Sequence, residues 1–220
     1  MKKVGWVIIW AIAFGYVEAS VVEYLRALYY PLTEGGFQFP ILSLAHFESL
    51  GPEHIHRLKI EIAREFSTLV MLATVGAAAA NNRREAWANF MIAFGVWDIF
   101  FYIWLRVFLD WPPSLMTWDL LFLIPAPWVG PVIAPVIISI ALIIAGLVVL
   151  FFEDKGRPLL LKWRDWLLIV IGGVIVIVSF CWDYKNIMKG GFPDPFEWKI
   201  FFIGLTLSAV TFFLAARRKT

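Results

Sequence analysis

Six apolar segments of this chain have about the length that crosses a lipid bilayer. They cover residues 4–29, 62–80, 86–109, 131–152, 166–184 and 197–216. A membrane-spanning helix needs about 20 mostly apolar residues, and its backbone polar groups must be satisfied without water. The pattern therefore predicts an all-α integral membrane protein with one domain, residues 1–220. We expect a six-helix bundle built from hairpins over about 4–80, 86–152 and 166–216.

The composition agrees with the membrane class and excludes others. Hydrophobic residues make up 61% of the chain, and the mean hydropathy is +0.78. The net charge is only +2, and the basic residues lie near segment ends instead of forming a stripe, so no nucleic-acid partner is expected. Cys181 is the single cysteine, which excludes an intramolecular disulfide.

Basic residues beside the predicted spans indicate the orientation. Such residues favour the cytoplasmic side of a membrane, and they collect on one side if both termini are cytoplasmic. The residues concerned are Lys2, Lys3, Arg83, Arg84, Lys155, Arg157, Lys162, Arg164, Arg217, Arg218 and Lys219. We therefore expect a multi-pass protein of the cell membrane whose chemistry faces the extracytoplasmic side.

Residues 12–26 and 92–106 resemble two copies of one helix. At an offset of 80 they share Ile-Ala-Phe-Gly and a terminal Leu-Arg, giving six identities in fifteen positions. Roughly one identity would be expected by chance, so the match indicates an internal repeat that relates the first span to the third. Repeated halves often enclose a binding site at their interface in transporters.

Each copy carries an acid, Glu18 in the first and Asp98 in the second. A carboxylate in an apolar span is unfavourable by roughly 2.5 to 3.5 kcal/mol on insertion scales, and such residues are commonly functional. The alternative is that each acid bonds a neighbouring Trp, Tyr or Arg and only holds the bundle together. A weaker echo, Trp182-Asp183 against Trp97-Asp98, adds Asp183 to the candidate ligand-binding residues if the repeat is threefold.

Arg26 and Arg106 end the repeated motif, eight residues beyond the acids. That separation is about 12 Å along a helix, so an ion pair within one helix is not expected. The arginines either extend to lipid phosphates or receive the anionic group of a ligand.

Two segments on the outer side are expected to lie against the bundle. The first, residues 30–56, contains a stretch at 39–47 that suits a short amphipathic interfacial helix. The second runs from Asp110 to Pro135 and holds an apolar stretch, Leu120 to Ile124, that is too short to span. We expect it to enter the outer leaflet or to pack across helix ends.

A helix beginning at Pro52 would place His54, Glu61 and Glu65 on one face. One imidazole and two carboxylates there suggest a divalent metal ion as cofactor, with zinc, manganese and iron all acceptable. Basic residues interleave with these acids, so a solvated, salt-bridged helix extension would look the same.

These observations leave three functions open. The leading hypothesis is a transporter-like protein whose outward-facing acidic cavity binds a proton, a metal cation or a cationic small molecule. The alternative is a membrane-embedded enzyme, metal-dependent if the histidine set is real, that acts on a lipid or quinone-like substrate. The third is an accessory subunit, and a homodimer or a membrane-protein partner is compatible with all three.

Overall fold

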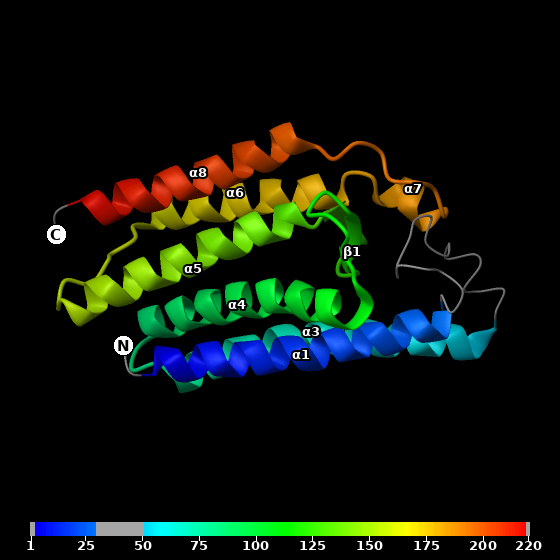
Figure 1. The fold of residues 1–220 in the computed structure, drawn as a ribbon. Helices are drawn as coiled ribbons and strands as arrows, with labels where there is room; N and C mark the ends of the chain where they lie inside the picture. The colour runs from blue at the N-terminus through cyan, green and yellow to red at the C-terminus, as the bar shows by residue number, and fades with distance from the viewer. Residues whose placement is uncertain (1–2, 30–50, 219–220) are drawn as a thin grey trace.

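The computed structural model describes residues 3–29 and 51–218. Seven helices and two strands make up the described chain: α1 (Val4–Tyr29), α3 (Pro52–Ala78), α4 (Arg83–Leu109), β1 (Trp118–Phe122), β2 (Trp128–Pro131), α5 (Ile133–Asp154), α6 (Trp163–Cys181), α7 (Tyr184–Met188) and α8 (Trp198–Arg217). Figure 1 shows the long helices running side by side, with both termini at one end of the bundle. The interfacial helix expected at 39–47 lies outside the described residues.

Five of these helices are long and apolar enough to cross a membrane: α1, α4, α5, α6 and α8. Each coincides within a few residues with a span expected from the sequence. The chain is therefore an α-helical, multi-pass membrane protein. The remaining expected span, 62–80, overlaps the second part of α3, which is one helix of 27 residues but carries too many charged residues to count among the five.

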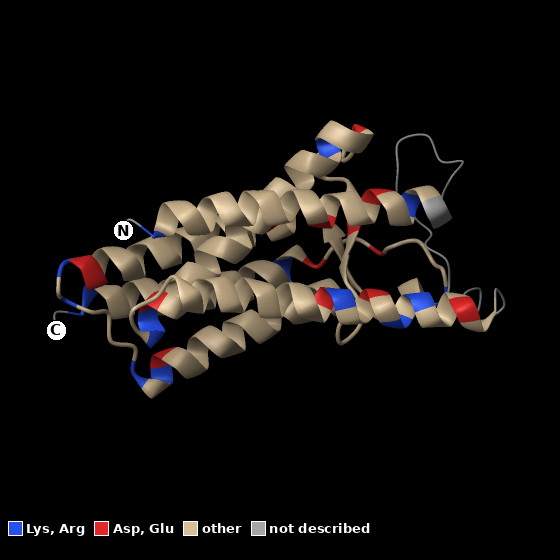
Figure 2. Cartoon of the chain, turned by 90° about the horizontal axis from the view of Figure 1, so that it is seen from below, with Lys and Arg blue, Asp and Glu red and all other residues tan. Residues whose placement is uncertain are grey.

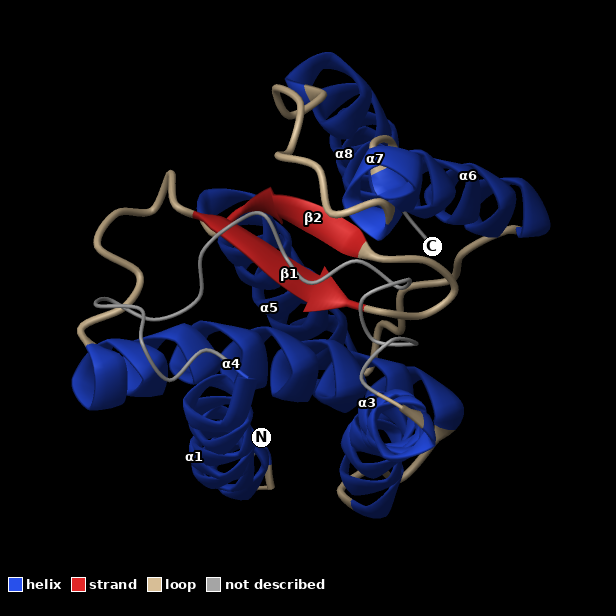
Figure 3. Cartoon of the chain, turned by 90° about the vertical axis from the view of Figure 1, so that its right-hand side faces the viewer, coloured by secondary structure: helices blue, strands red, loops and turns tan. Residues whose placement is uncertain are grey.

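Helix α4 is the centre of the first group of helices, because it packs against α1, α3 and α5. A matched pair of glycines permits two of these contacts. A Cβ atom at Gly15 would lie 3.1 Å from the Trp97 carbonyl oxygen, and one at Gly95 would lie 2.5 Å from the Ser139 carbonyl oxygen. Helices α6 and α8 pack on each other as a second group and meet the first mainly near α5 and β2 (Figure 3).

The arrangement does not confirm a repeat of equivalent hairpins. Helices α4 and α5 pack closely, whereas α1 and α3 lie against the same partner, α4, and hardly contact each other. Two helices of similar sequence thus occupy different surroundings.

The ends of α4 follow standard capping. The Asn82 side chain accepts hydrogen bonds from the backbone N–H groups of Arg84 and Glu85, which satisfies donors left open at the helix start. Asp110 ends the helix in the left-handed conformation, with φ of 52°. This turn directs the chain across the bundle.

The segment after α4 forms a hairpin. Strands β1 and β2 pair antiparallel, with Trp118 opposite Pro131 and Leu120 opposite Val129. Figure 3 shows this hairpin lying across the ends of the helices, between the α4 group and the α6–α8 pair. Of the two arrangements expected for Leu120 to Ile124, packing across helix ends is the one found, and Leu120 and Phe122 pair with β2.

Candidate functional site

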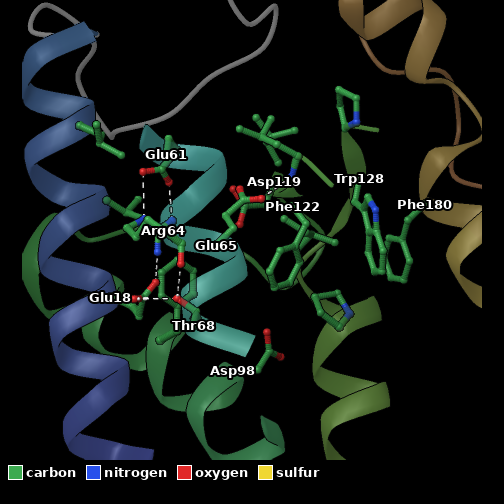
Figure 4. Close-up of a pocket in the computed structure, with 18 of the residues that line it drawn as sticks. Glu18, Glu61, Arg64, Glu65, Thr68, Asp98, Asp119, Phe122, Trp128 and Phe180 are labelled. Carbon is green, nitrogen blue, oxygen red and sulfur yellow. Dashed lines mark hydrogen bonds and ion pairs between the residues drawn. The ribbon is translucent and has the colours of Figure 1, made fainter. Parts of the chain in front are cut away.

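A cavity of about 320 Å³ lies beneath the hairpin. Its walls come from α1, α3 and α4 on one side and from the hairpin, α5, α6 and α7 on the other (Figure 4). Five acidic residues line it, Glu18, Glu61, Glu65, Asp98 and Asp119, against three arginines, Arg26, Arg57 and Arg64. The ionisable lining therefore carries an excess of acids over bases.

One cluster of charges connects α1 with α3. The Arg64 guanidinium forms ion pairs with both Glu18 and Glu61, and its Nε lies 2.9 Å from Glu61 Oε2. The Thr68 hydroxyl donates to Glu18 Oε1 at 3.0 Å. The buried Glu18 carboxylate is thus compensated by a cation and a hydroxyl from α3, as Figure 4 shows.

A second cluster connects the hairpin with α1 and α4. Arg26 Nη2 lies 3.6 Å from Asp119 Oδ1, and the Tyr102 hydroxyl donates to Asp119 Oδ2 at 3.0 Å. The Arg26 guanidinium also lies over the Trp111 ring, 3.9 Å from its centroid. Burial raises the pKa of Asp119 from 3.8 to about 6, while Arg26, Tyr102 and the Leu120 backbone favour the charged form.

Two acids in the cavity have no ion pair with any described residue, namely Glu65 and Asp98. Glu65 Oε2 accepts a hydrogen bond from the Leu123 backbone N–H at 2.9 Å, which ties α3 to the hairpin. Asp98 Oδ2 accepts a hydrogen bond from the Ser139 hydroxyl at 2.7 Å. Both side chains are buried, and each has only a neutral donor.

Aromatic rings cover much of the remaining wall. Helix α4 contributes Phe94, Trp97 and Phe101, and the hairpin contributes Phe122 and Trp128. Trp128 stacks on Phe180 of α6, with ring centroids 6.0 Å apart and planes inclined by 15°. Aromatic faces next to carboxylates attract organic cations through the ring quadrupole and the negative charge together.

The structure brings together most of the residues predicted from the sequence. Glu18, Asp98, Arg26, Glu61 and Glu65 all line the cavity. Asp183 does not lie there: it precedes α7, where its Oδ2 accepts hydrogen bonds from Asn186 Nδ2 at 3.0 Å and from the Asp194 backbone at 2.9 Å. The expected convergence of Asp183 with the other two acids is therefore wrong.

Arg106 also lies outside the cavity. Its side chain is 53% exposed, and it donates to the Asp110 carbonyl oxygen at the end of its own helix. The terminal arginine of the repeated motif is thus buried and paired in α1 but exposed in α4.

The proposed metal ligands do not form a ligand set. Among residues 3–29 and 51–218, no three His, Cys, Asp or Glu side chains are placed to hold a metal ion. His54 is not among the residues that line the cavity, the Glu61 carboxylate is engaged by Arg64, and Glu65 accepts from the hairpin. The salt-bridged helix, which was the alternative, describes this face of α3 better.

Sequence reasoning missed several residues of the site, among them Arg64, Thr68 and Asp119. Arg64 is one of the basic residues that interleave with the acids of α3, and its position three residues after Glu61 permits an ion pair on one face. Thr68 follows Arg64 by four residues, which continues the same face. Asp119 gave a usable signal, because it is the one charged residue in the apolar stretch from Leu115 to Val129.

Comparison with known proteins identifies no relative: no family model, no curated protein and no solved structure matches this chain.

Proposed function

We propose that this protein binds an organic cation in the cavity and is transporter-like. The observation that carries the proposal is the pair Glu65 and Asp98, two buried carboxyls that form no ion pair with any described residue, in a cavity walled by aromatic rings. A buried carboxylate needs a compensating charge, and a bound cation supplies it. The aromatic wall favours an organic cation over a metal ion, which would need several converging oxygen or nitrogen ligands.

We further propose that α3 is a sixth span and that both termini are cytoplasmic, in the cell membrane. The two ends of the chain lie at the same end of the bundle, which requires an even number of crossings (Figure 1). In Figure 2 the charged residues of α3 gather at the end opposite the termini, which leaves its second half apolar. The loops on the side of the termini carry Arg83, Arg84 and Lys155, which supports a cytoplasmic position.

The likeness of residues 12–26 to residues 92–106 still favours a common origin of α1 and α4. We propose that the repeat extends only over these two helices, because their neighbours differ. The enzyme hypothesis gains no comparable support, because His54 is absent from the cavity lining and Glu61 is occupied by Arg64.

The test is binding of tetraethylammonium to the purified protein, measured by calorimetry in detergent. Asp98→Asn and Glu65→Gln keep an oxygen for Ser139 and for Leu123 but remove the charge, so each should weaken binding at least about tenfold. Asp110→Asn and Glu23→Gln are matched controls outside the cavity lining and should bind as the wild type does.

Equal binding by all four variants, or no binding by the wild type, would overturn the proposed cation site. Transport is tested separately, by uptake of the same cation into proteoliposomes. Binding without uptake would leave a cation-binding membrane protein that is not a transporter.

A further inference from the structure

Most of the charged residues that line the cavity form ion pairs with one another. Arg64 pairs with Glu18 and Glu61, and Arg26 pairs with Asp119. Three charged lining residues then have no ion pair in the described chain: the acids Glu65 and Asp98 and one base, Arg57. The cavity thus offers negative charge in its buried part and positive charge on an exposed residue of α3.

Arg57 and Glu65 place opposite charges at two levels of the cavity along α3. They are eight residues apart, which is about 12 Å of helix rise. Both side chains line the cavity, so a ligand bound there can present a positive group to Glu65 and a negative group to Arg57. Arg57 does not pair with Glu61, although the two are one helical turn apart.

The cavity wall indicates that the same ligand has an apolar part. Besides the aromatic rings, the lining includes Leu58 on α3 and Ile187 and Met188 on α7. Among the described residues, α3 does not pack closely on α6, α7 or α8, and Leu58 lines the cavity from α3 while Ile187 and Met188 line it from α7. Other apolar side chains of the same two helices are exposed, including Ile62 and Phe66 of α3 and Tyr184 of α7.

The size of the cavity limits what it encloses. At about 320 Å³ it is at the lower end of the range for small-molecule sites, so it accommodates a head group but not a long-chain lipid as a whole. A side of the cavity bordered by exposed apolar residues at a membrane interface allows chains to remain in the bilayer while the head group is bound.

We infer that the ligand is a zwitterionic lipid with an ammonium and a phosphate, whose head group enters the cavity between α3 and α7. The ammonium binds among Glu65, Asp98 and the aromatic rings, and the phosphate binds Arg57. This inference rests on the proposed cation site and specifies its ligand class.

The experiment compares two probes with the same alkyl chain, lysophosphatidylcholine and an alkyltrimethylammonium, bound to the full-length protein in nanodiscs. Free concentrations are corrected with protein-free nanodiscs. The readout is the ratio of the two affinities. Arg57→Gln should lower the ratio of zwitterionic to cationic affinity at least about tenfold, because it removes the phosphate partner. Lys59→Gln, an equally exposed base that does not line the cavity, is the matched control and should leave the ratio at the wild-type value.

A third probe, glycerophosphocholine, has the head group without a chain. We expect it to bind at least about tenfold more weakly than lysophosphatidylcholine, and equal affinity would overturn access from the bilayer. A ratio that is the same in Arg57→Gln and Lys59→Gln would overturn the zwitterionic ligand. If the cation site itself is wrong, Glu65→Gln will bind alkyltrimethylammonium as tightly as the wild type, an outcome distinct from both.

Discussion

Helices α1 and α4 carry the same motif but use its charged residues differently. Glu18 of α1 is neutralised by Arg64 and hydrogen-bonded by Thr68, whereas the corresponding Asp98 of α4 has, within the described part of the chain, only the Ser139 hydroxyl as a partner. At the other end of the motif, the Arg26 side chain is 8% exposed and paired with Asp119, while the Arg106 side chain is 53% exposed. Both charged residues of the motif are thus paired in α1, with α3 and with the hairpin, whereas the Asp98 carboxyl of α4 forms no ion pair with a described residue.

The role of an acid within a membrane span therefore depends on the residues of the neighbouring helices. Helix α1 lies next to the charged half of α3, which supplies a cation. Helix α4 presents Asp98 to α5, whose apolar sequence offers one serine. An acid without a cation is the better candidate for binding one from outside.

The contrast between Glu18 and Asp98 is tested most directly by removing the cation beside Glu18. Arg64→Met leaves two carboxylates, one of them deeply buried, without compensation, and should lower the free energy of unfolding by about 4 kcal/mol. The measurement is denaturant unfolding in detergent micelles. Adding Glu18→Gln should restore most of the loss.

The control for this variant is Arg84→Met, which removes a more exposed ion pair with Glu153 and should change stability by less than about 1 kcal/mol. If Arg64→Met were as stable as the wild type, Glu18 would not depend on its partner and the contrast with Asp98 would fail.

The two terminal arginines allow a matched test of the second difference. Arg26→Met should destabilise the protein by about 3 kcal/mol, because it leaves the Asp119 carboxylate buried and removes the contact with Trp111. Arg106→Met should change stability by less than about 0.5 kcal/mol, since its partners are exposed. Thermal unfolding of both variants measures the difference, and similar losses would contradict the structural asymmetry.

The glycines of the motif test how closely α4 packs against α1 and against α5. Gly95→Ala would place a methyl group 2.5 Å from the Ser139 carbonyl oxygen, and we expect a loss of about 2 kcal/mol. Gly15→Ala meets its nearest atom at 3.1 Å and should lose about 1 kcal/mol or less. Unfolding measurements in which Gly15→Ala is the more damaging change would show that α4 approaches α1 more closely than α5.

A further expected effect is a pH dependence that comes from Asp119. Its pKa is raised from 3.8 to about 6, so the folded protein binds this proton more tightly than the unfolded chain. Stability from this group is full below about pH 4 and is lost as the pH rises through about 6. The wild type should gain about 1 kcal/mol between pH 7 and pH 5 relative to Asp119→Asn, measured by unfolding at both pH values. Equal pH profiles would show that Asp119 keeps an ordinary pKa.

The site could be predicted from the sequence only in part. Acids in apolar spans stand out, because a carboxylate is rare where water is absent, and this placed Glu18, Asp98 and Glu65 in the candidate site. The roles of Arg64 and Asp119 depend on which element lies opposite them. Helical periodicity relates residues of one helix to each other, but it contains nothing about the rotation of a helix against its neighbours.

Three properties could be derived from the sequence without the structure: the helical membrane class, the five apolar spans and the acids within them. These follow from segment length and hydropathy, which act along the chain. The tertiary structure alone decided that Glu18 is neutralised and Asp98 is not, that Arg26 is buried and Arg106 exposed, and that Asp183 stands apart. Each of these depends on contacts between residues tens of positions apart, such as Arg64 with Glu18 and Ser139 with Asp98, and only packing brings such residues together.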